Sequence, residues 1–533
     1  MRRAPDEAAR QADARAREAA QTSFERPLLL VAGAGTGKTS ALVARIVSWS
    51  MGRGWLDAQR RLAERQRPGA PPECPGPETV AARVFERVVA ITFTEAAAAE
   101  MASRVAEALA AVAKDERPEW ILPEALPEEN STRIIRARAL LVCLDRLVVC
   151  TIHAFCRRIL SRNPMEAGLH PAFTVDADSE TLEAIVREVI ERWLRVTLAG
   201  TPPDELLELA ERGIGPAEIA GAVKELASAG APPEALRADP LEPARLAALA
   251  RRLADVLRAV AEIAVPRFAG SKKARNAALI ADVLPGLAER VAAAPSLAEL
   301  QRALESDLPE KLREHLGKWG KANYNKTEEE ALGDAGVELA LSARTLRAAV
   351  EHALGIDAVL LRAVRTVVAP LVEEVRQTMR RRGAETFDAL LRDTRDLLLR
   401  RPEVVARERG AISQLLVDEF QDTDPLQCEI VRLLALEGAP DERPGLFLVG
   451  DPKQSIFGWR NADLAAYDAF RSLIAERGDV LGLSVNFRSA PPILAEVERC
   501  VRPVMKAETG VQPEFQSLQP SEARAASSLP PMA

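Results

Sequence analysis

The sequence is poor in aromatic residues, cysteine and histidine, and each scarcity excludes a class of protein. Aromatic residues make up 4% of the 533 residues, so an aromatic side chain inside a motif is informative. The six cysteines include no Cys-x-x-Cys pair, which argues against a disulfide framework or zinc ribbon and indicates reduced thiols in a cytoplasmic protein. The four histidines are scattered, which disfavours a histidine-based metal site. No apolar run approaches the ~18 residues of a membrane span, so no membrane partner is expected.

The net charge of the chain limits how it can bind nucleic acid. The formal net charge is −7, with 28% charged and 47% hydrophobic residues, as is typical of a globular protein long enough for several domains. An acidic total argues against a generally basic nucleic-acid-binding protein. It leaves room for a local basic groove, because association depends on the electrostatic field at the binding face.

Short apolar runs alternate with helical patterns in two parts of the chain. Runs of strand length occur at residues 27–31, 88–91, 147–152, 415–417, 446–449 and 480–483. Buried strands that alternate with helices predict an α/β fold with a doubly wound parallel sheet. Between about 160 and 385 such runs vanish and amphipathic helices dominate, so we expect an inserted helical domain. The Arg-, Pro- and Gly-rich residues 52–80 predict a surface insertion.

The first apolar run leads into a glycine-rich loop that is followed by a helical pattern. The loop is a P-loop with alanine at its first position: Ala32, Gly33, Ala34, Gly35, Thr36, Gly37, Lys38 and Thr39. Its glycines let backbone N–H groups turn inward around phosphate oxygens, Lys38 supplies positive charge to the β- and γ-phosphates, and the Thr39 hydroxyl can bind Mg²⁺. A glycine-rich turn without function would not need this strand and helix around it. The loop therefore predicts a site for ATP and Mg²⁺.

Two acidic residues after a later run complete such a site. Asp418 and Glu419 directly follow the apolar residues 415–417. Asp418 would hold the Mg²⁺ ion, and Glu419 would orient or deprotonate the attacking water. An exposed Asp-Glu turn is the alternative, but the preceding strand and the P-loop favour the catalytic interpretation. About 380 positions separate Lys38 from Asp418, more chain than one compact sheet needs, which again indicates an inserted domain.

Six elements, taken in order, resemble the motifs of UvrD/Rep-like superfamily 1 DNA helicases. They are the P-loop, residues 92–101 (TFTEAAAAEM) with Arg104, 151–156 (TIHAFC), 418–427 (DEFQDTDPLQ), 449–460 (VGDPKQSIFGWR) and 486–489 (NFRS). The Asp-Pro-Lys-Gln sequence, the helical insert and residues 387–391 (FDALL) favour the RecB/AddA branch. The resemblance implies a discontinuous RecA-like ATP-binding domain, residues 1–160 and 385–490, with the helical insert at 161–384.

The resemblance also implies roles for single residues in ATP turnover. Gln454 would sense the γ-phosphate, and Arg488 would stabilise charge on the transferred phosphoryl group. Gln421 would help to position the γ-phosphate, and Phe487 would stack on adenine. Two residues are candidates for the N-terminal glutamine that reads adenine in this family: Gln11 and Gln21.

Three further side chains lie where the family contacts single-stranded DNA: Phe93, His153 and Trp459. Stacking suits a helicase because every base presents a π-face, so the contact needs no sequence preference. The alternative for these side chains is a place in the core. A basic stretch from Lys311 to Lys326, with Trp319 and Tyr324 between its charges, is either a DNA-contacting loop or a solvated face.

The segment after Ser489 bears on how much of a helicase motor the sequence contains. Motifs V and VI are not recognisable, and residues 491–533 are expected to be the start of a truncated second RecA-like domain or a disordered tail. The resemblance implies an ATP-dependent 3′–5′ DNA helicase that acts in recombination or double-strand break repair. The alternative is a truncated or split ATP- and DNA-binding module without unwinding activity of its own. Its partner would be a helicase–nuclease subunit or the missing C-terminal half.

Overall fold

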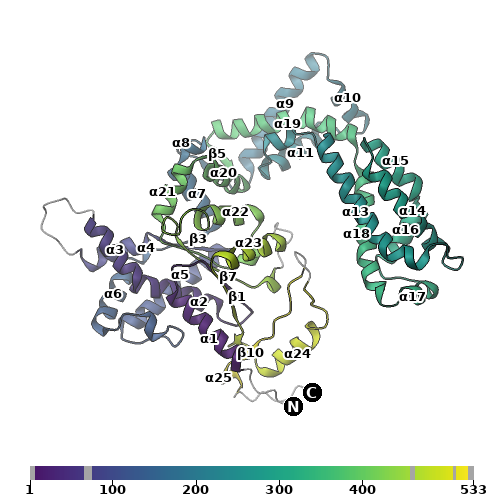
Figure 1. Ribbon diagram of the computed structural model, residues 1–533. Coiled ribbons are helices and arrows are strands. Elements are labelled where there is room, and N and C mark those ends of the chain that lie inside the picture. The colour runs from purple at the N-terminus through teal and green to yellow at the C-terminus, as the bar shows by residue number, and fades with distance from the viewer. Residues whose placement is uncertain (1–6, 65–74, 456–462, 508–511, 526–533) are drawn as a thin grey trace. The chain divides into compact units, whose positions relative to one another are not determined.

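The structure, a computed structural model, describes residues 7–64, 75–455, 463–507 and 512–525. The chain divides into two compact units, one within residues 1–177 and 380–533 and the other at residues 178–379. The first unit contains the sheet, and the second is helical (Figure 1). Within the described ranges, no helix combines the length and the apolar character that crossing a membrane requires.

Six parallel strands form the main sheet, in the order β3-β2-β6-β7-β1-β8. The strands are β1 Leu28–Ala32, β2 Val88–Thr92, β3 Val148–Thr151, β6 Gln414–Val417, β7 Gly445–Gly450 and β8 Asp479–Leu483. Each coincides with one of the apolar runs in the sequence. The predicted fold class, a RecA-like parallel sheet with a helical insertion, is therefore confirmed.

The strands are apolar throughout because helices cover both faces of the sheet. In β1, Leu28 and Leu30 belong to the hydrophobic cluster on one face, whereas Leu29 belongs to the cluster on the other face. All three side chains are at most 2% exposed. Burial on both faces fixes the strand register and thus the loops at the strand ends.

Helices of the first unit surround this sheet. They are α1 Glu7–Thr22, α2 Lys38–Met51, α3 Arg53–Glu64, α4 Pro77–Phe85, α5 Glu95–Ala113, α6 Asn130–Val142, α7 Ile152–Arg162, α8 Pro164–Ala167, α20 Phe387–Arg400, α21 Pro402–Ala411, α22 Pro425–Ala435, α23 Leu464–Arg477, α24 Pro491–Val501 and α25 Glu522–Ala525. The expectation of a surface insertion at 52–80 was wrong for its described ends. Trp55 of α3 is 3% exposed, and Val80 of α4 is fully buried, because both helices pack into the core beside α2.

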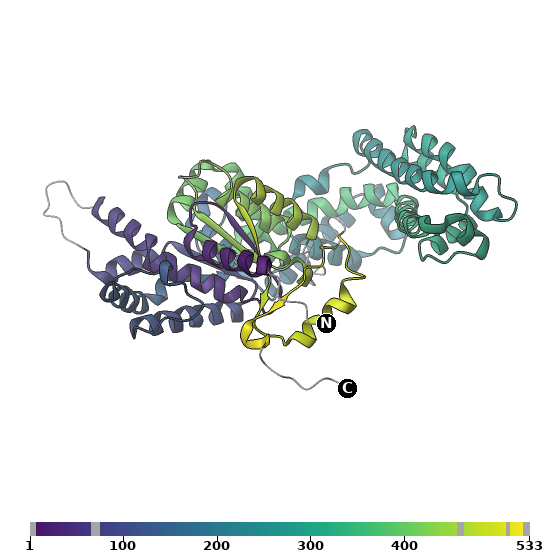
Figure 2. The same cartoon turned by 60° about the horizontal axis from the view of Figure 1, so that its bottom comes forward.

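Short strand pairs and the C-terminal segment complete the first unit. β4 (Thr174–Asp176) pairs with β5 (Ala384–Thr386), and β9 (Val485–Asn486) pairs with β10 (Gln519–Pro520), both in parallel. α1 packs against α2 and β8, and Figure 2 shows α1 in purple beside the yellow C-terminal segment. Arg10 of α1 donates a hydrogen bond to Glu522 at 3.0 Å.

The second unit is a helical domain with its own core. Its helices are α9 Glu180–Ala199, α10 Asp204–Glu211, α11 Pro216–Ser228, α12 Pro233–Arg237, α13 Pro243–Phe268, α14 Arg275–Ala292, α15 Leu297–Asp307, α16 Glu310–Trp319, α17 Lys326–Leu332, α18 Gly336–Gly355 and α19 Ala358–Arg381, the last of which continues into the first unit. Trp319 is fully buried and stacks on Phe268 with ring centroids 5.6 Å apart. The Tyr324 hydroxyl donates to the Gly336 carbonyl at 2.6 Å. These two aromatics serve the fold, and DNA contact by the charged residues of the basic stretch stays a prediction.

Candidate functional site

The motif loops meet along one edge of the sheet, because parallel strands all end on the same side. β2 and β3 end together at Thr92 and Thr151, which are paired in register. β1 and β8 likewise end together at Ala32 and Leu483, and β6 and β7 lie between these two pairs. The carboxyl edge of such a sheet is where α/β proteins bind ligands.

The loop between β1 and α2 has the backbone that a phosphate cradle requires. Gly35 and Gly37 have φ angles of 74° and 88°, in the left-handed region that favours glycine. A Cβ at Gly35 would lie 2.8 Å from Asn486 Nδ2 and from Arg488 Cβ, so only glycine fits there. The backbone thus brings Arg488 against the loop. Its guanidinium group is exposed and makes no hydrogen bond or ion pair with the described residues.

Two hydrogen bonds to main-chain carbonyls tie the segment after β8 to the same loop. Asn486 Nδ2 donates a hydrogen bond to the Ala34 carbonyl at 2.6 Å, and the Phe487 amide donates to the Gly35 carbonyl at 2.8 Å. The Phe487 ring is 50% exposed. An accessible aromatic face therefore stands beside the phosphate loop, where sequence analysis placed the base of ATP.

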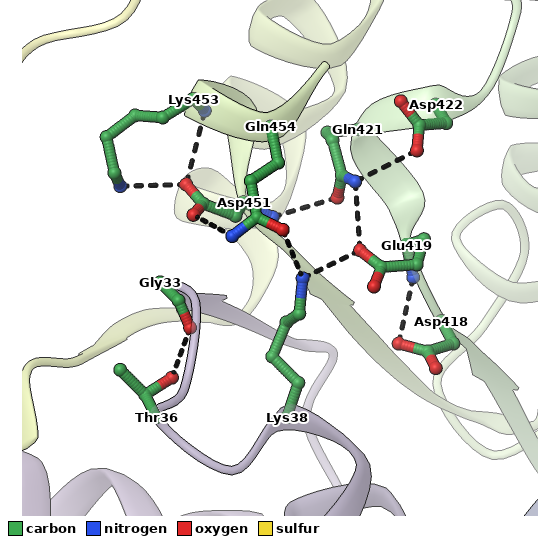
Figure 3. A network of polar contacts seen from close by, with 10 residues as sticks. All are labelled: Gly33, Thr36, Lys38, Asp418, Glu419, Gln421, Asp422, Asp451, Lys453 and Gln454. Carbon is green, nitrogen blue, oxygen red and sulfur yellow. Dashed lines mark hydrogen bonds and ion pairs between the residues drawn. The ribbon is translucent and has the colours of Figure 1, made fainter. Parts of the chain in front are cut away.

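Lys38, the first residue of α2, connects three motifs that are far apart in the sequence. Its Nζ lies 2.7 Å from Glu419 Oε2 and 3.4 Å from Gln454 Oε1 (Figure 3). Glu419 has a φ of 49°, a left-handed value that is uncommon for a residue with a Cβ. Such backbone strain is often found where a side chain must be aimed for function.

Gln421 cross-links the loops that follow β6 and β7. Its Nε2 donates to Glu419 Oε2 at 2.9 Å and to Asp422 Oδ2 at 3.0 Å, while its Oε1 accepts from the Asp451 amide at 2.8 Å. Gln454 Nε2 donates to Asp451 Oδ2 at 2.7 Å. The predicted γ-phosphate residues thus form one hydrogen-bonded network with Lys38 (Figure 3).

Clustered carboxylates make this network suited to cations. Burial, reinforced by the negative charge of Glu419, raises the pKa of Asp418 to about 6, and the same two causes raise the pKa of Asp422 to about 6. A divalent cation would relieve both causes, because it replaces lost hydration and neutralises the repulsion. Carboxylate and hydroxyl oxygens are ligands that Mg²⁺ prefers. Asp418 and Thr39, which follows Lys38 at the start of α2, fit the ion on chemistry.

Aromatic side chains occupy the part of the edge formed by β2 and β3. Phe93 directly follows β2, and His153 lies in the first turn of α7, directly after β3. The His153 ring stacks on Phe387, with centroids 3.8 Å apart and planes at 22°. Phe387 is 47% exposed. Burial lowers the pKa of His153 to about 4. Trp459, the remaining predicted DNA contact, lies outside the described residues.

Comparison with known proteins identifies the family. The family model of the UvrD/REP helicase N-terminal domain matches residues 13–474, which include the whole network described above. The chain belongs to the UvrD/REP helicase family. This finding confirms the resemblance that the motifs indicated.

Similar proteins within the UvrD/REP family include parts of helicase–nucleases. The chain is 28% identical to an ATP-dependent helicase/nuclease subunit from Desulforudis audaxviator, over 92% of this chain and 40% of the relative. It is also 28% identical to the RecBCD enzyme subunit RecB of Escherichia coli K12, over 88% of this chain and 37% of the relative. The chain thus spans at most 40% of the length of these two relatives.

The structure decides against one of the two candidate glutamines for reading adenine. Gln21 is 3% exposed; its Nε2 donates to the Trp120 carbonyl at 3.0 Å, and its Oε1 accepts from the Leu122 amide at 2.9 Å. Both ends of this amide are therefore occupied away from the phosphate loop. Gln11 lies on the exposed surface of α1. The role of an N-terminal glutamine, which the UvrD/REP family led us to expect, stays a prediction for Gln11 alone.

Two residues of α1 that sequence analysis did not single out do reach the site. Arg17 Nη2 donates to the Thr36 carbonyl at 2.9 Å, and the Thr36 hydroxyl closes the turn by donating to the Gly33 carbonyl at 2.8 Å. Asp13, 3% exposed, accepts from Arg17 Nε at 2.6 Å. The i, i+4 spacing of Asp13 and Arg17 could have indicated an ion pair on α1. Such pairs are common on solvent-exposed helices, so the spacing alone does not indicate a functional site.

Proposed function

We propose that this chain binds ATP with Mg²⁺ and single-stranded DNA and forms the ATP-hydrolysing part of a 3′–5′ DNA helicase. The observation that carries the proposal is the meeting of Lys38, Glu419 and Gln454 at one point. These residues come from loops after three different strands, which the parallel sheet brings to one edge, and their polar groups lie within hydrogen-bond distance of Lys38 there. A cation, a carboxylate and an amide at the end of a P-loop are the groups that phosphoryl transfer to water requires.

Each group in this network has a task that its contacts support. Lys38 would exchange its ion pair with Glu419 for phosphate oxygens, which frees Glu419 to orient the attacking water. Gln454 can donate and accept, and so can report on the γ-phosphate while it holds Asp451. Mg²⁺, when held by Asp418 and Thr39, would neutralise charge that develops on the phosphates. The exposed guanidinium of Arg488 would serve the same purpose.

Single-stranded DNA is proposed to bind at the β2 and β3 end of the same edge. Phe93 follows β2 there, and Phe387 presents a half-exposed ring stacked on His153. Because the lowered pKa keeps His153 neutral near pH 7, its contribution would be stacking and not charge. Two ligands on one edge allow nucleotide state and DNA contact to influence one another.

The setting of this activity is also a proposal. The names of the two relatives describe a helicase/nuclease component and a component of the RecBCD enzyme. We therefore propose a role in recombination or double-strand break repair, together with a partner chain. The described cysteines are all free thiols, as suits a reducing cytoplasm.

The test is ATP turnover by the purified chain, with and without oligo-dT. We expect turnover that DNA stimulates and that Glu419→Gln abolishes while ATP still binds, because Gln keeps the shape but loses the charge. Glu442→Gln is the matched control, since Glu442 is exposed and precedes β7 at the opposite edge of the sheet. ATP binding without turnover, with or without DNA, would refute the hydrolytic assignment and leave an ATP- and DNA-binding module. Turnover that oligo-dT does not change would refute the proposal that single-stranded DNA binds at the β2 and β3 end of the sheet edge.

A further inference from the structure

A cavity of about 730 Å³ lies at the amino edge of the sheet, opposite the edge that carries the phosphate loop. Its walls include residues that precede three strands: Arg87 before β2, Leu147 before β3 and Ile412 before β6. Residues of α4, α7 and α21 complete the walls. Small-molecule sites have volumes of ~300–1,000 Å³, so this cavity is large enough to be one.

Arginines dominate the lining of this cavity. Six arginines and three carboxylates line it, which gives a local net charge of +3 in a chain whose formal net charge is −7. They are Arg83, Arg87, Arg146, Arg158, Arg162 and Arg407, with Glu86, Asp145 and Glu408. Glu166 pairs with Arg407 at 3.1 Å from outside the lining, and an excess of positive charge remains. A cavity with such an excess attracts an anion.

One face of α7 places two of these arginines beside apolar surface. Phe155, Arg158, Ile159 and Arg162 stand at positions i, i+3, i+4 and i+7, so they share one face of the helix. Phe155 and Ile159 are at most 3% exposed and anchor this face in the core. Val148, which begins the edge strand β3, is half-buried and also lines the cavity. The cavity therefore offers an apolar wall next to guanidinium groups.

The fold uses some of these arginines and leaves others available. Arg87 is 6% exposed and donates to the Gly410 carbonyl at 2.6 Å, which is a structural task. Arg162 has Glu408 at 3.5 Å. Arg158 is half-buried and makes no hydrogen bond or ion pair with any described residue. Burial and the positive charge of Arg162 lower the pKa of Arg158, and a bound anion would relieve both effects.

Guanidinium groups determine which ligand suits the cavity. Their planar forks donate two parallel hydrogen bonds to a phosphate or a carboxylate. A phosphate monoester carries nearly two negative charges near pH 7, so it matches the excess of positive charge better than one carboxylate does. We propose that this cavity binds a small organic phosphate, with its phosphate group on Arg158 and Arg162 and its organic group against Val148. This site is separate from the proposed nucleotide site and does not depend on it.

The experiment titrates the purified chain with 1-naphthyl phosphate, an aromatic monophosphate, and follows the fluorescence of this probe. The wild type should bind the probe saturably, and Arg158→Gln should weaken binding by about tenfold or more, because a charge-assisted contact is lost. Arg157→Gln is the matched control and should bind as the wild type does, since Arg157 is exposed beside Arg158 on α7 but does not line the cavity. Arg162→Gln should also weaken binding and serves as the second variant if Arg158→Gln does not fold.

Four results would overturn the proposal. The first is a wild type without saturable binding up to about 1 mM probe. The second is equal weakening by Arg157→Gln and Arg158→Gln, which would show attraction by general charge. The third is loss of binding in Lys38→Ala but not in Arg158→Gln, which would put the probe in the phosphate loop and leave the proposed nucleotide site standing. The fourth is displacement of the probe by oligo-dT whose own affinity falls in Arg158→Gln, which would assign these arginines to DNA.

Discussion

Asp13 offers a sharp test of how α1 is fastened to the candidate site. Its buried carboxylate accepts hydrogen bonds from the Ser484 and Val485 amides and from Arg17, all between 2.6 and 2.8 Å. Asp13→Ala leaves two amides and a guanidinium without their acceptor. A buried group left unsatisfied costs ~1–3 kcal/mol, and breaking a buried ion pair costs ~3–5 kcal/mol. Because Arg17 is partly exposed to solvent, we expect the free energy of local unfolding around Ser484 and Val485 to fall by about 3 kcal/mol.

Hydrogen exchange measures this loss directly. A change of 1.36 kcal/mol corresponds to a tenfold change in an equilibrium constant. If the Ser484 and Val485 amides exchange through local opening, a loss of about 3 kcal/mol therefore makes them exchange roughly a hundredfold faster. Amides of β2, in the part of the sheet remote from β8, should be unaffected. Asp13→Asn keeps one acceptor oxygen and should give an intermediate rate. Exchange within threefold of wild type at both amides of Asp13→Ala would refute the reasoning, because it would mean that water or another group replaces the carboxylate at no cost.

Three further predictions concern the nucleotide and DNA sites. Lys38→Ala should abolish ATP binding, because it removes the charge at the end of the P-loop; unchanged affinity for labelled ATP would contradict the assignment. Phe387→Ala should weaken oligo-dT binding by ~1–3 kcal/mol if its exposed ring stacks on a base, and a folded variant with wild-type affinity would show a structural ring instead. The His153 pKa of about 4 lies below its value of ~6.5 in the unfolded chain. Between pH 6.5 and pH 4 the unfolded state therefore binds more protons than the folded state, and the free energy of unfolding falls as the pH drops through this range. From pH 7 to pH 5, the wild type should therefore lose about 2 kcal/mol more unfolding free energy than His153→Phe, measured by denaturant titration of each protein; equal losses would show an unshifted histidine.

The candidate ATP site was predictable because its signals are local. A P-loop needs a strand, a glycine-rich turn and a helix within about fifteen residues, and each of these leaves its own pattern. Glu419 and Gln454 likewise lie in short motifs at strand ends. Parallel strands end on one side of a sheet, so the convergence of these motifs at Lys38 follows once the strands are recognised.

Contacts between distant segments were not predictable in the same way. The sequence leaves Gln11 and Gln21 equivalent, and only packing against the Trp120–Leu122 turn shows that both ends of the Gln21 amide are occupied. It also makes Trp319 a plausible DNA contact, which the core of the second unit excludes by burying the ring completely.

The sequence by itself determined the family, the sheet strands and the motif residues that meet at Lys38, since each depends on a pattern of neighbours along the chain. The tertiary structure decided which side chains outside the motifs take part. Arg17 reaches the loop after β1, and Asp13 reaches the segment after β8, because α1 packs against α2 and β8. Phe387 meets His153 across more than 200 residues. Those contacts depend on how helices pack on the sheet, and packing depends on the shapes of many side chains at once.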